Sequence, residues 1–575
     1  MGLLEGNTEG GMKKMSAQTG GTIPVIIMKE GTGRTKGREA QRNNITAAMT
    51  MGEVLKSTLG PRGMDKMLVD SLGDVTITND GATILKDIDV QHPAAKMMVE
   101  AAKTQDTIVG DGTTTVVVLA SELLKKSEEL LGQDIHPIVL VGGYKKAANM
   151  ALKVLDQVAW DVDLKDKKTL ANVATTAIGS KSIATARKIL VDIAIDAISS
   201  IAEKRGDQWV ADVDQVQVIK KSGGSIGESQ LIRGIIVDKE VVHPGMPKRI
   251  ENAKIALVDS ALEIEKTEIS AEIRIKDPSQ MKAFLDEEAR MLQDMVGKVK
   301  AAGASVLFCQ KGIDDVAQHF LAKAGILVAR RAKKSDMEKL ARATGARVVS
   351  DLASLKGSDL GRAGVVEERK IGDDKLIVVE KCKNPKSVCI LIRGGLERFV
   401  DEAERALHDA LSVVADVYEK SRMVAGGGSF EAEAAKRIKA YASKVGGREQ
   451  LAVEAFADAL EIIPKTLATN AGIDPIDIMV NLRASHERAS GLWFGVDVHA
   501  GKAADMKKLA VLEPIRVKEQ AIKSAVEATS MILRIDDVIA AAKSAAPPMP
   551  PGGGGMEGMG GMPPGMGGMG GMPPM

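Results

Sequence analysis

The chain has 575 residues, of which 44% are hydrophobic and 27% are charged, and its formal net charge is +1. It is too long for a single hydrophobic core, so we expect about two to four domains of ordinary globular composition. The balanced charge gives no electrostatic reason to expect a specific nucleic acid or an anionic membrane as a partner. No apolar run approaches the roughly 20 residues that span a bilayer.

The cysteines predict neither disulfides nor a zinc site, and the N-terminus predicts a cytoplasmic protein. Cys309, Cys382 and Cys389 are too few for a disulfide framework and fit no usual zinc-site spacing, so we expect them to be small buried residues. Residues 1–21 are rich in glycine and threonine and lack the apolar segment of a secretory signal. They have few large side chains to bury, which predicts a disordered tail.

The first ordered elements are predicted to be a strand at residues 24–28, a helix at residues 39–59 and an alternating strand at residues 75–78. Gly60-Pro61 is a strong stop signal for the helix. The strand runs into the turn Asn79-Asp80-Gly81, in which an aspartate is most often an ordinary turn residue.

Residues 91–161 are predicted to be helical almost throughout, with breaks at His136-Pro137 and at Gly142-Gly143. Within this stretch, Gly110-Asp111-Gly112-Thr113-Thr114-Thr115 precedes a run whose apolar residues recur at helical spacing from Val116 onward. The three threonines therefore stand at a helix N-terminus, where unpaired backbone N–H groups and the helix dipole favour an anion.

Asp111 is the most informative residue of that turn. A carboxylate beside a bound phosphate is repulsive unless a divalent cation lies between them, and Mg2+ takes few protein carboxylates together with phosphate oxygens. The residues therefore suggest a Mg-nucleotide site. An ordinary loop in which a threonine caps the next helix explains the same six residues about equally well.

The middle of the chain alternates strands and helices, which predicts an α/β unit. Strands are expected at residues 254–258, 305–309, 326–329 and 346–349, and helices at residues 313–324 and 335–344. A charged insert with sparse apolar residues lies inside this unit, at residues 263–298.

A buried strand at residues 387–395 leads into a long helix at residues 397–419. Asp409 lies off the apolar stripe of this helix. From the residues alone it is a solvated carboxylate paired with Arg405 at i−4. The triple glycine at 426–428 follows as a loop that another group can approach closely.

Four motifs, in this order, resemble the nucleotide pocket of a chaperonin: Thr58-Leu59-Gly60-Pro61, Asn79-Asp80-Gly81, the 110–115 turn and Gly426-Gly427-Gly428. The resemblance covers nearly the whole chain and is strongest to the archaeal group II chaperonins. It implies a multidomain α and α/β fold, with a mainly helical equatorial ATP domain, a small α/β intermediate domain and an α/β apical domain that carries a helical protrusion.

The resemblance also implies how the chain is divided. We expect the equatorial ATP-binding domain at residues 22–162 and 421–544, the intermediate hinge domain at 163–231 and 386–420, and the apical substrate-binding domain at 232–385, with a lid protrusion at about 263–298. Residues 545–575 contain only Ala, Pro, Met, Gly and one Glu, a composition that predicts a disordered tail. The residues implied to bind nucleotide then lie before and after the inserted domains in the sequence. Movement of the inserted domains is therefore linked to both halves of the nucleotide pocket.

Single residues acquire roles by the same resemblance. Asp409 and Asp80 are implied to be the catalytic carboxylates, Asp111 to hold Mg2+, and Lys181 to approach the γ-phosphate. With ATP and Mg2+ as cofactors, the implied nucleotide-binding set is Leu59, Gly60, Pro61, Gly110, Gly112, Thr113, Thr114, Thr115, Lys181, Gly427 and Glu513.

The implied function is an ATP-driven folding chamber, whose partners are unfolded or non-native proteins and identical or related subunits in a double ring. A metabolic kinase or P-loop ATPase is disfavoured because the sequence contains no Gly-x-x-x-x-Gly-Lys-Ser/Thr motif. A passive ring that uses nucleotide only for assembly is the third hypothesis. The three carboxylates of Asp80, Asp111 and Asp409 favour hydrolysis over it.

Overall fold

A computed structural model describes residues 33–181, 186–264 and 278–540. The described residues divide into two compact units, one made of residues 33–36 and 537–540 and the other lying within residues 37–536. In the first unit, β1 (Gly33–Lys36) pairs antiparallel with β21 (Asp537–Ala540). The expected strand at 24–28 and the expected tails at 1–21 and 545–575 lie outside the described residues.

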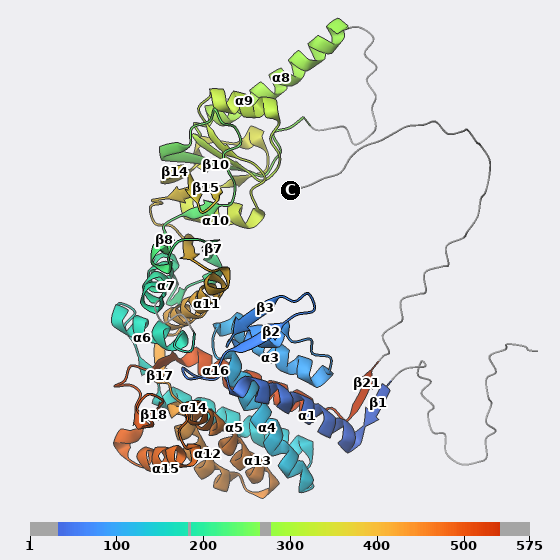
Figure 1. Ribbon diagram of the computed structural model, residues 1–575, viewed down its shortest axis with the longest axis vertical. Coiled ribbons are helices and arrows are strands. Elements are labelled where there is room, and N and C mark those ends of the chain that lie inside the picture. Colours follow the sequence, from blue (N-terminus) through green and yellow to red (C-terminus); the bar gives the residue numbers. More distant parts are fainter. Residues whose placement is uncertain (1–32, 182–185, 265–277, 541–575) are drawn as a thin grey trace, which may run out of the picture. The chain divides into compact units, whose positions relative to one another are not determined.

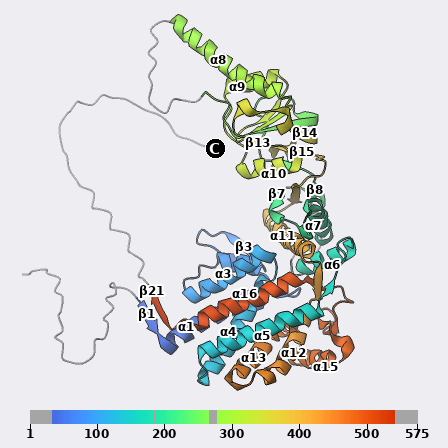
Figure 2. The same ribbon diagram turned by 180° about the vertical axis from the view of Figure 1, so that it is seen from behind.

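Helices from both ends of the second unit share one hydrophobic core (Figures 1 and 2). Those from its N-terminal part are α1 (Gly37–Lys56), α2 (Gly81–Asp87), α3 (Pro93–Val109), α4 (Thr113–Gly132) and α5 (Pro137–Val158). Those from its C-terminal part are α12 (Ser429–Val445), α13 (Gly447–Leu460) and α16 (Ile515–Leu533). Two further helices, α14 (Ile462–Asn470) and α15 (Pro475–His486), pack in a separate, smaller cluster with Leu59 and Val118. The helix α16 packs against α3, α4 and α5.

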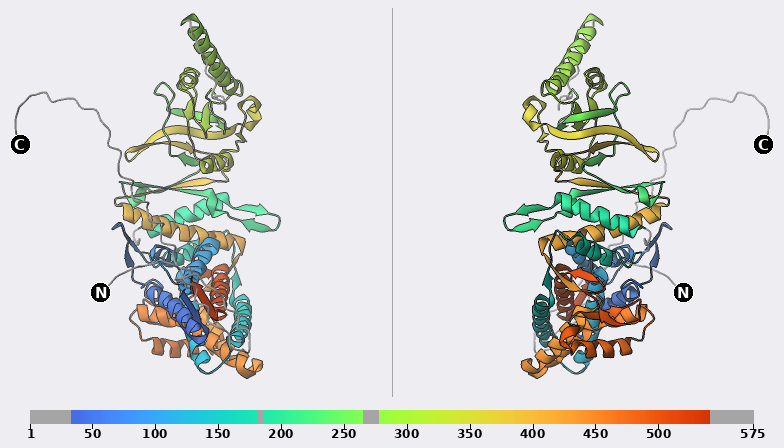
Figure 3. Two further views of the ribbon diagram at one scale, coloured as in Figure 1. Left: turned by 90° about the vertical axis from the view of Figure 1, so that its right-hand side faces the viewer. Right: turned by 90° about the vertical axis from the view of Figure 1, so that its left-hand side faces the viewer.

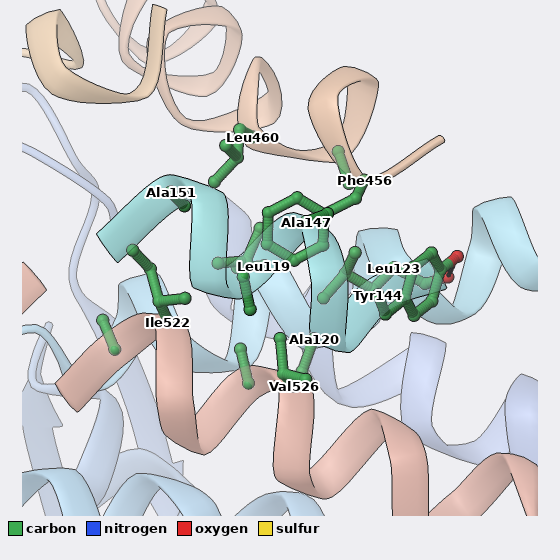
Figure 4. Close-up of a cluster of buried hydrophobic side chains, with 14 of the residues drawn as sticks. Leu119, Ala120, Leu123, Tyr144, Ala147, Ala151, Phe456, Leu460, Ile522 and Val526 are labelled. Atoms are coloured by element: carbon green, nitrogen blue, oxygen red, sulfur yellow. Dashed lines mark hydrogen bonds between the residues drawn. The ribbon is translucent and has the colours of Figure 1, made fainter. Parts of the chain in front are cut away.

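The apolar stripe of α4 lies at the centre of this core. Leu119 and Leu123 face Tyr144 of α5 and Phe456 of α13, while Ala120 meets Val526 of α16 (Figure 4). These side chains are almost completely removed from water, and such burial contributes about 1.5–3 kcal/mol for each large one. The helix that opens at the 110–115 turn is therefore anchored along its length.

One expected break is wrong. The predicted break at His136-Pro137 is confirmed, since His136 is the N-cap of α5, but α5 continues through Gly142 and Gly143 without interruption. A Cβ at Gly143 would lie 2.5 Å from the Cβ of Ala452 on α13. The glycine is thus explained by the close approach of two helices, which local sequence does not reveal.

The next group of elements surrounds a three-stranded sheet, ordered β7-β16-β8. Its strands are β7 (Val216–Ser222), β8 (Gln230–Ile232) and β16 (Val388–Gly394). The associated helices are α6 (Lys167–Ala177), α7 (Arg187–Ile201) and α11 (Glu397–Glu419). The observed bounds of α11 are those predicted, and its buried face joins a core with α6 and α7.

The middle part of the sequence forms a seven-stranded mixed sheet, ordered β12-β11-β10-β14-β15-β9 with β13 beside β10. Its strands are β9 (Ile235–Val237), β10 (Arg249–Val258), β11 (Val306–Cys309), β12 (Leu327–Ala329), β13 (Val348–Val349), β14 (Gly361–Ile371) and β15 (Asp374–Glu380), with helices α8 (Pro278–Ala301), α9 (Asp315–Lys323) and α10 (Lys334–Thr344). The predicted α/β alternation is confirmed, and the long antiparallel pair of β14 and β15 is visible in Figure 3. The three cysteines are buried and unpaired, as expected.

Short strands complete the fold. They are β2 (Lys66–Val69) with β3 (Val75–Thr78), β4 (Trp160–Asp161) with β17 (Arg422–Ala425) and β20 (Leu512–Pro514), β5 (Glu203–Arg205) with β6 (Gln208–Val210), and β18 (Phe494–Asp497) with β19 (Lys502–Asp505). Among the helices at 33–181, 186–264 and 278–540, none is long and apolar enough to cross a membrane.

Candidate functional site

A cavity of about 800 Å3 brings the four sequence motifs together. This volume is within the range of small-molecule sites. Its lining contains Leu59, Gly60, Pro61, Asp80, Asp111, Gly112, Thr113, Thr114, Thr115, Lys181, Asp409, Gly427 and Glu513. Of the residues predicted to form the site, Gly110 is the one that does not line the cavity.

Two glycines shape the turn between α3 and α4. Gly110 and Gly112 have φ values of 63° and 79°, in the left-handed region that glycine adopts with least strain. A Cβ at Gly110 would lie 2.2 Å from the side chain of Ser412 on α11. Gly110 therefore allows α11 to approach the turn, and its contribution to the cavity is indirect.

The N-terminus of α4 is open to an anion. Gly112 is its N-cap and makes no side-chain capping bond, so the threonine cap offered as an alternative is not formed. The first backbone N–H groups of a helix have no partner within the helix, and here Thr113, Thr114 and Thr115 line the cavity. This end of the cavity has the donors and the dipole that suit a phosphate.

Asp111 lies in the same turn, with its carboxylate 2.6 Å from the backbone N–H of Gly112, which donates to it. Burial raises the pKa of Asp111, and the hydrogen bond from Gly112 and the charge of Lys181 offset part of that rise. A half-buried carboxylate of this kind gains from a nearby cation, because the cation replaces part of the hydration that its charge has lost.

Asp80 is fixed by the helix that it begins. Its Oδ2 accepts a hydrogen bond of 2.8 Å from the backbone N–H of Thr83, so it is the N-cap of α2. The turn explanation is thus correct locally, and Asp80 also lines the cavity. Burial alone would raise its pKa, but Lys181 and the bonds from Thr83 more than offset this, and the pKa lies below its usual value.

Lys181 joins two carboxylates from different parts of the sequence. Its Nζ lies 3.3 Å from Oδ2 of Asp409 and 3.9 Å from Oδ1 of Asp80, and its side chain is only 3% exposed. Burial would lower the pKa of Lys181, but the two aspartates outweigh burial and raise it. The lysine therefore stays positively charged inside the cavity.

Asp409 is not the solvated residue that its helix position alone suggested. It is buried, and Arg405 pairs with Glu402 at 2.8 Å instead of with Asp409. Burial raises the pKa of Asp409 well above its usual value, although Lys181 opposes the shift. Asp80 and Asp409 thus share one lysine but differ in basicity, the kind of difference that separates catalytic carboxylates by role.

The opposite part of the cavity is apolar. Leu59, Ile463, Leu467 and Val496 line it and belong to one buried cluster. Gly60, with φ 83°, is packed so closely that a Cβ there would lie 2.3 Å from Leu467. A phosphate-binding helix end and an apolar wall in one cavity suit a nucleotide, whose phosphates and base need different surroundings.

Sequence reasoning missed several lining residues, among them Arg187, Asp497 and Lys518. Lys518 is buried between Glu431 and Glu513, at 2.8 and 2.7 Å. A lysine on an amphipathic helix is usually solvated, so no local pattern identifies it. The salt bridge to Glu513 also explains why that predicted residue, which lies on β20, is held beside the cavity.

The residues present fit a magnesium ion that is bound mainly through a nucleotide. Among the residues that the structure describes, no group of three or more His, Cys, Asp or Glu side chains could hold a metal by itself. Mg2+ commonly takes only one or two carboxylates and completes its shell with phosphate oxygens and water. Asp111, beside the open end of α4, would supply such a carboxylate.

Comparison with known proteins agrees with this geometry. Residues 51–543 match the family model of the TCP-1/cpn60 chaperonin family. The chain is 60% identical over 518 residues to the thermosome subunit beta of Sulfurisphaera tokodaii, covering 90% of this chain and 94% of that protein. It is 58% identical to the thermosome subunit alpha of Archaeoglobus fulgidus, over 90% of this chain and 95% of the relative. The thermosome subunit of Pyrococcus horikoshii is 57% identical, over 90% and 94%.

Proposed function

The chain belongs to the TCP-1/cpn60 chaperonin family, as a group II chaperonin of the archaeal type. On this premise we propose that it is a ring-forming subunit that uses Mg-ATP to enclose unfolded proteins. Its general function is that of an ATP-dependent chaperonin. The proposal adds the hydrolytic residues, the cofactors ATP and Mg2+, the partners and the movement that follows.

The observation that carries the proposal is the cluster of Asp80, Lys181 and Asp409 at the open N-terminus of α4. A ring that used nucleotide only for assembly would need the phosphate donors of α4. It would have no need for a buried lysine and two carboxylates of different basicity beside them. Such groups are what phosphoryl transfer to water requires, namely charge neutralisation and a placed water.

The residues divide the work as follows. Bound Mg2+ would neutralise charge on the β- and γ-phosphate oxygens. Asp111 would hold that ion, and the backbone N–H groups at the start of α4 would orient the phosphates. Lys181 would contact the terminal phosphate, while Asp409, the more basic carboxylate, would orient a water and accept its proton with Asp80 beside it. A general base contributes about 10²–10⁴-fold to a rate.

The domain assignment supports a link between hydrolysis and movement. We assign residues 22–162 and 421–544 to the equatorial domain, 163–231 and 386–420 to the intermediate domain, and 232–385 to the apical domain. Asp80 and Asp111 then belong to the equatorial domain, whereas Lys181 and Asp409 belong to the intermediate domain. The catalytic set is complete only when the two domains meet, so closure of the cavity and rotation of the intermediate domain would be one event.

The proposed function also implies the partners. Non-native proteins would occupy a chamber formed by a double ring of identical or related subunits in the cytoplasm. The α8 helix supports this, because Met281, Phe284 and Leu285 expose about half of their surface there (51%, 42% and 54%). A protrusion at about 263–298 would use such residues to close the chamber.

The test is phosphate release from ATP by the purified chain, measured with Mg2+, with a chelator, and with and without an unfolded protein. We expect hydrolysis that requires Mg2+, together with recovery of native client protein that requires ATP. A chain that bound ATP but neither hydrolysed it nor refolded a client would favour the passive ring. Turnover of a small phosphate acceptor instead of water would favour a kinase.

A further inference from the structure

A buried ionic cluster lies beside the cavity and has no part in the hydrolytic scheme above. Lys518, in the first turn of α16, has its Nζ 2.8 Å from Oε1 of Glu431 and 2.7 Å from Oε2 of Glu513. The three side chains are 6%, 4% and 19% exposed. Charges removed from water in this way are costly unless they are paired, so removal of one partner strongly disturbs the others.

Both glutamates belong to the surroundings of the triple-glycine loop. Glu431 lies in the first turn of α12, three residues after Gly428. The carboxylate of Glu513 abuts Gly426, where a Cβ would lie 2.6 Å from its Oε1. Gly426 also donates its backbone N–H to the carbonyl of Val511 at 3.0 Å. Lys518 therefore holds the two ends of this loop through one ammonium group.

The first turn of α16 also contacts the turn between α3 and α4, which contains Asp111 and Gly112. Gln105 of α3 is fully buried, and its Nε2 donates to the carbonyl oxygens of Asp111, at 2.8 Å, and Val517, at 3.2 Å. A Cβ at Gly112 would lie 3.0 Å from Nε2 of Gln105 and 3.0 Å from Cγ1 of Val517. Val517 thus approaches the Asp111–Gly112 turn directly, and Lys518 reaches the triple-glycine loop through Glu431 and Glu513.

We propose that Lys518 is a positioning residue for nucleotide binding, which fixes the separation between the triple-glycine loop and the Asp111–Gly112 turn through Glu431, Glu513 and the Gln105 bridge. This inference rests on the proposed nucleotide function. The first turn of α16 would then set the distance between the triple-glycine loop and the Asp111–Gly112 turn, the two parts of the cavity that would contact the nucleotide.

The charges explain why a lysine is needed at this position. Glu431 and Glu513 both direct a carboxyl oxygen at the one ammonium group of Lys518, and Oε2 of Glu431 has no hydrogen-bond partner among the described residues. Without the ammonium group, the buried Glu431 and the half-buried Glu513 would lose the cation that they share. An apolar side chain of the same length would fill the space but would not hold them.

The test compares Lys518→Met with Lys518→Arg, and uses Glu433→Gln as the matched control. Glu433 is also a buried carboxylate on α12, paired with His486 and Arg437, but it does not line the cavity. The readouts are the Kd for MgADP from calorimetry, the Tm without nucleotide, and KM and kcat for ATP. We expect Lys518→Met to raise Kd and KM by about tenfold or more, with a much smaller change in kcat, because the partners of Lys518 do not include Asp409 or Lys181.

Lys518→Arg, which keeps the charge, is expected to restore Kd to within about threefold of the unaltered chain. Glu433→Gln is expected to lower Tm without a comparable change in Kd. The proposal is overturned if Lys518→Met binds MgADP as tightly as Glu433→Gln does, or if arginine is no better than methionine.

If Lys518→Met does not fold, Gln105→Leu and the double variant Glu431→Gln/Lys518→Met decide the matter. Each leaves fewer buried charges unpaired and should still raise Kd. Wild-type affinity in both would overturn the proposal. If the unaltered chain fails to bind MgADP, the proposed function itself is refuted. If the unaltered chain binds and hydrolyses nucleotide normally and Lys518→Met also binds normally, only the positioning role of Lys518 is refuted.

Discussion

Asp111, which is half-buried, and Asp409, which is buried, are carboxylates of the same cavity, but their neighbours differ. Asp111 lies beside the N-terminus of α4 and accepts from the Gly112 backbone, whereas Asp409 faces Lys181 from α11. The first environment suits a cation held against phosphates. The second suits a group that acts on water near the terminal phosphate. Their roles should therefore separate in experiments that measure binding and hydrolysis independently.

We expect Asp409→Ala to reduce ATP hydrolysis by about 10²–10⁴-fold while MgATP binding stays nearly unchanged. The reason is that water positioning is not needed for the contacts of Asp111 and α4 with Mg2+ and phosphate. Phosphate release and equilibrium nucleotide binding are the measurements. Asp401→Ala is the control, because Asp401 lies on the same helix but pairs with Lys220 outside the cavity.

Asp111→Ala should instead weaken MgATP binding itself by about tenfold or more, since it removes the carboxylate that would hold the metal. Excess Mg2+ should recover part of the loss. If Asp409→Ala and Asp111→Ala lost binding and turnover in the same proportion, the division of roles would be wrong.

At the scale of elements, the contact of α5 with α13 depends on Gly143. The substitution Gly143→Leu would force the two helices apart, because even a Cβ would overlap Ala452 and approach the backbone oxygen of Glu449 at 3.0 Å. Overpacking of this kind costs about 1–3 kcal/mol, which chemical denaturation would measure. The affinity for MgADP should change little, because neither helix contributes to the cavity lining.

The matched control for this substitution is Gly132→Ala. Gly132 ends α4 and has open space around it, so a methyl group is expected to be neutral or to stabilise by up to about 1 kcal/mol. Equal destabilisation by both substitutions would contradict the role assigned to the α5–α13 contact.

The elements that sequence predicted best are those whose periodicity reflects one buried face. The bounds of α11 were predicted at 397–419, and the strands and helices of the mixed sheet were found within a few residues. The break at Gly142-Gly143 was wrong because the glycine is required by another helix that is distant in sequence. Local pattern carries no information about that contact.

The candidate site shows the same limit. The phosphate turn could be found from glycine, hydroxyl and carboxylate spacing, since backbone donors at a helix start are a local property. The burial of Asp409 against Lys181 could not be found in this way, and the resemblance to a family was needed to reverse the expected pairing with Arg405. Lys518 was missed altogether, because its two partners come from other strands and helices.

At the scale of the whole molecule, the composition of the C-terminal segment predicts that it is not needed for assembly. A chain that ends at Ser544 would lose only Ala, Pro, Met, Gly and one Glu, which offer no packed core. We expect rings of normal size by electron microscopy and unchanged hydrolysis. A shorter chain that ends at Asp536 is the control, because it also removes β21 and its pairing with β1 and should be less stable. Failure of the Ser544 chain to form rings would refute this prediction.

The proposed lid gives the last prediction, and α8 shows where such a lid would begin. Leu292, Val296 and Val299 are buried against residues of β11 and α9, so the C-terminal part of α8 belongs to the mixed-sheet core. The earlier residues Met281, Phe284 and Leu285 are exposed, and residues 265–277 lie outside the described part. Deletion of residues 267–290 would thus remove the exposed portion and keep the packed one.

We expect the chain without residues 267–290 to form rings and hydrolyse ATP, because the cavity residues lie elsewhere, but to lose enclosure of a client. The measurement is protection of a captured unfolded protein from protease in the presence of ATP. A triple variant, Met281→Ser/Phe284→Ser/Leu285→Ser, should lose protection as well, because burial of these apolar side chains against neighbouring subunits would hold the lid closed. The control Lys282→Ser/Asp286→Ser/Glu287→Ser changes exposed charged residues of the same turns and should protect normally. If the deletion variant protected the client as well as the full chain does, the built-in lid would have to be abandoned even though ATP hydrolysis remained intact.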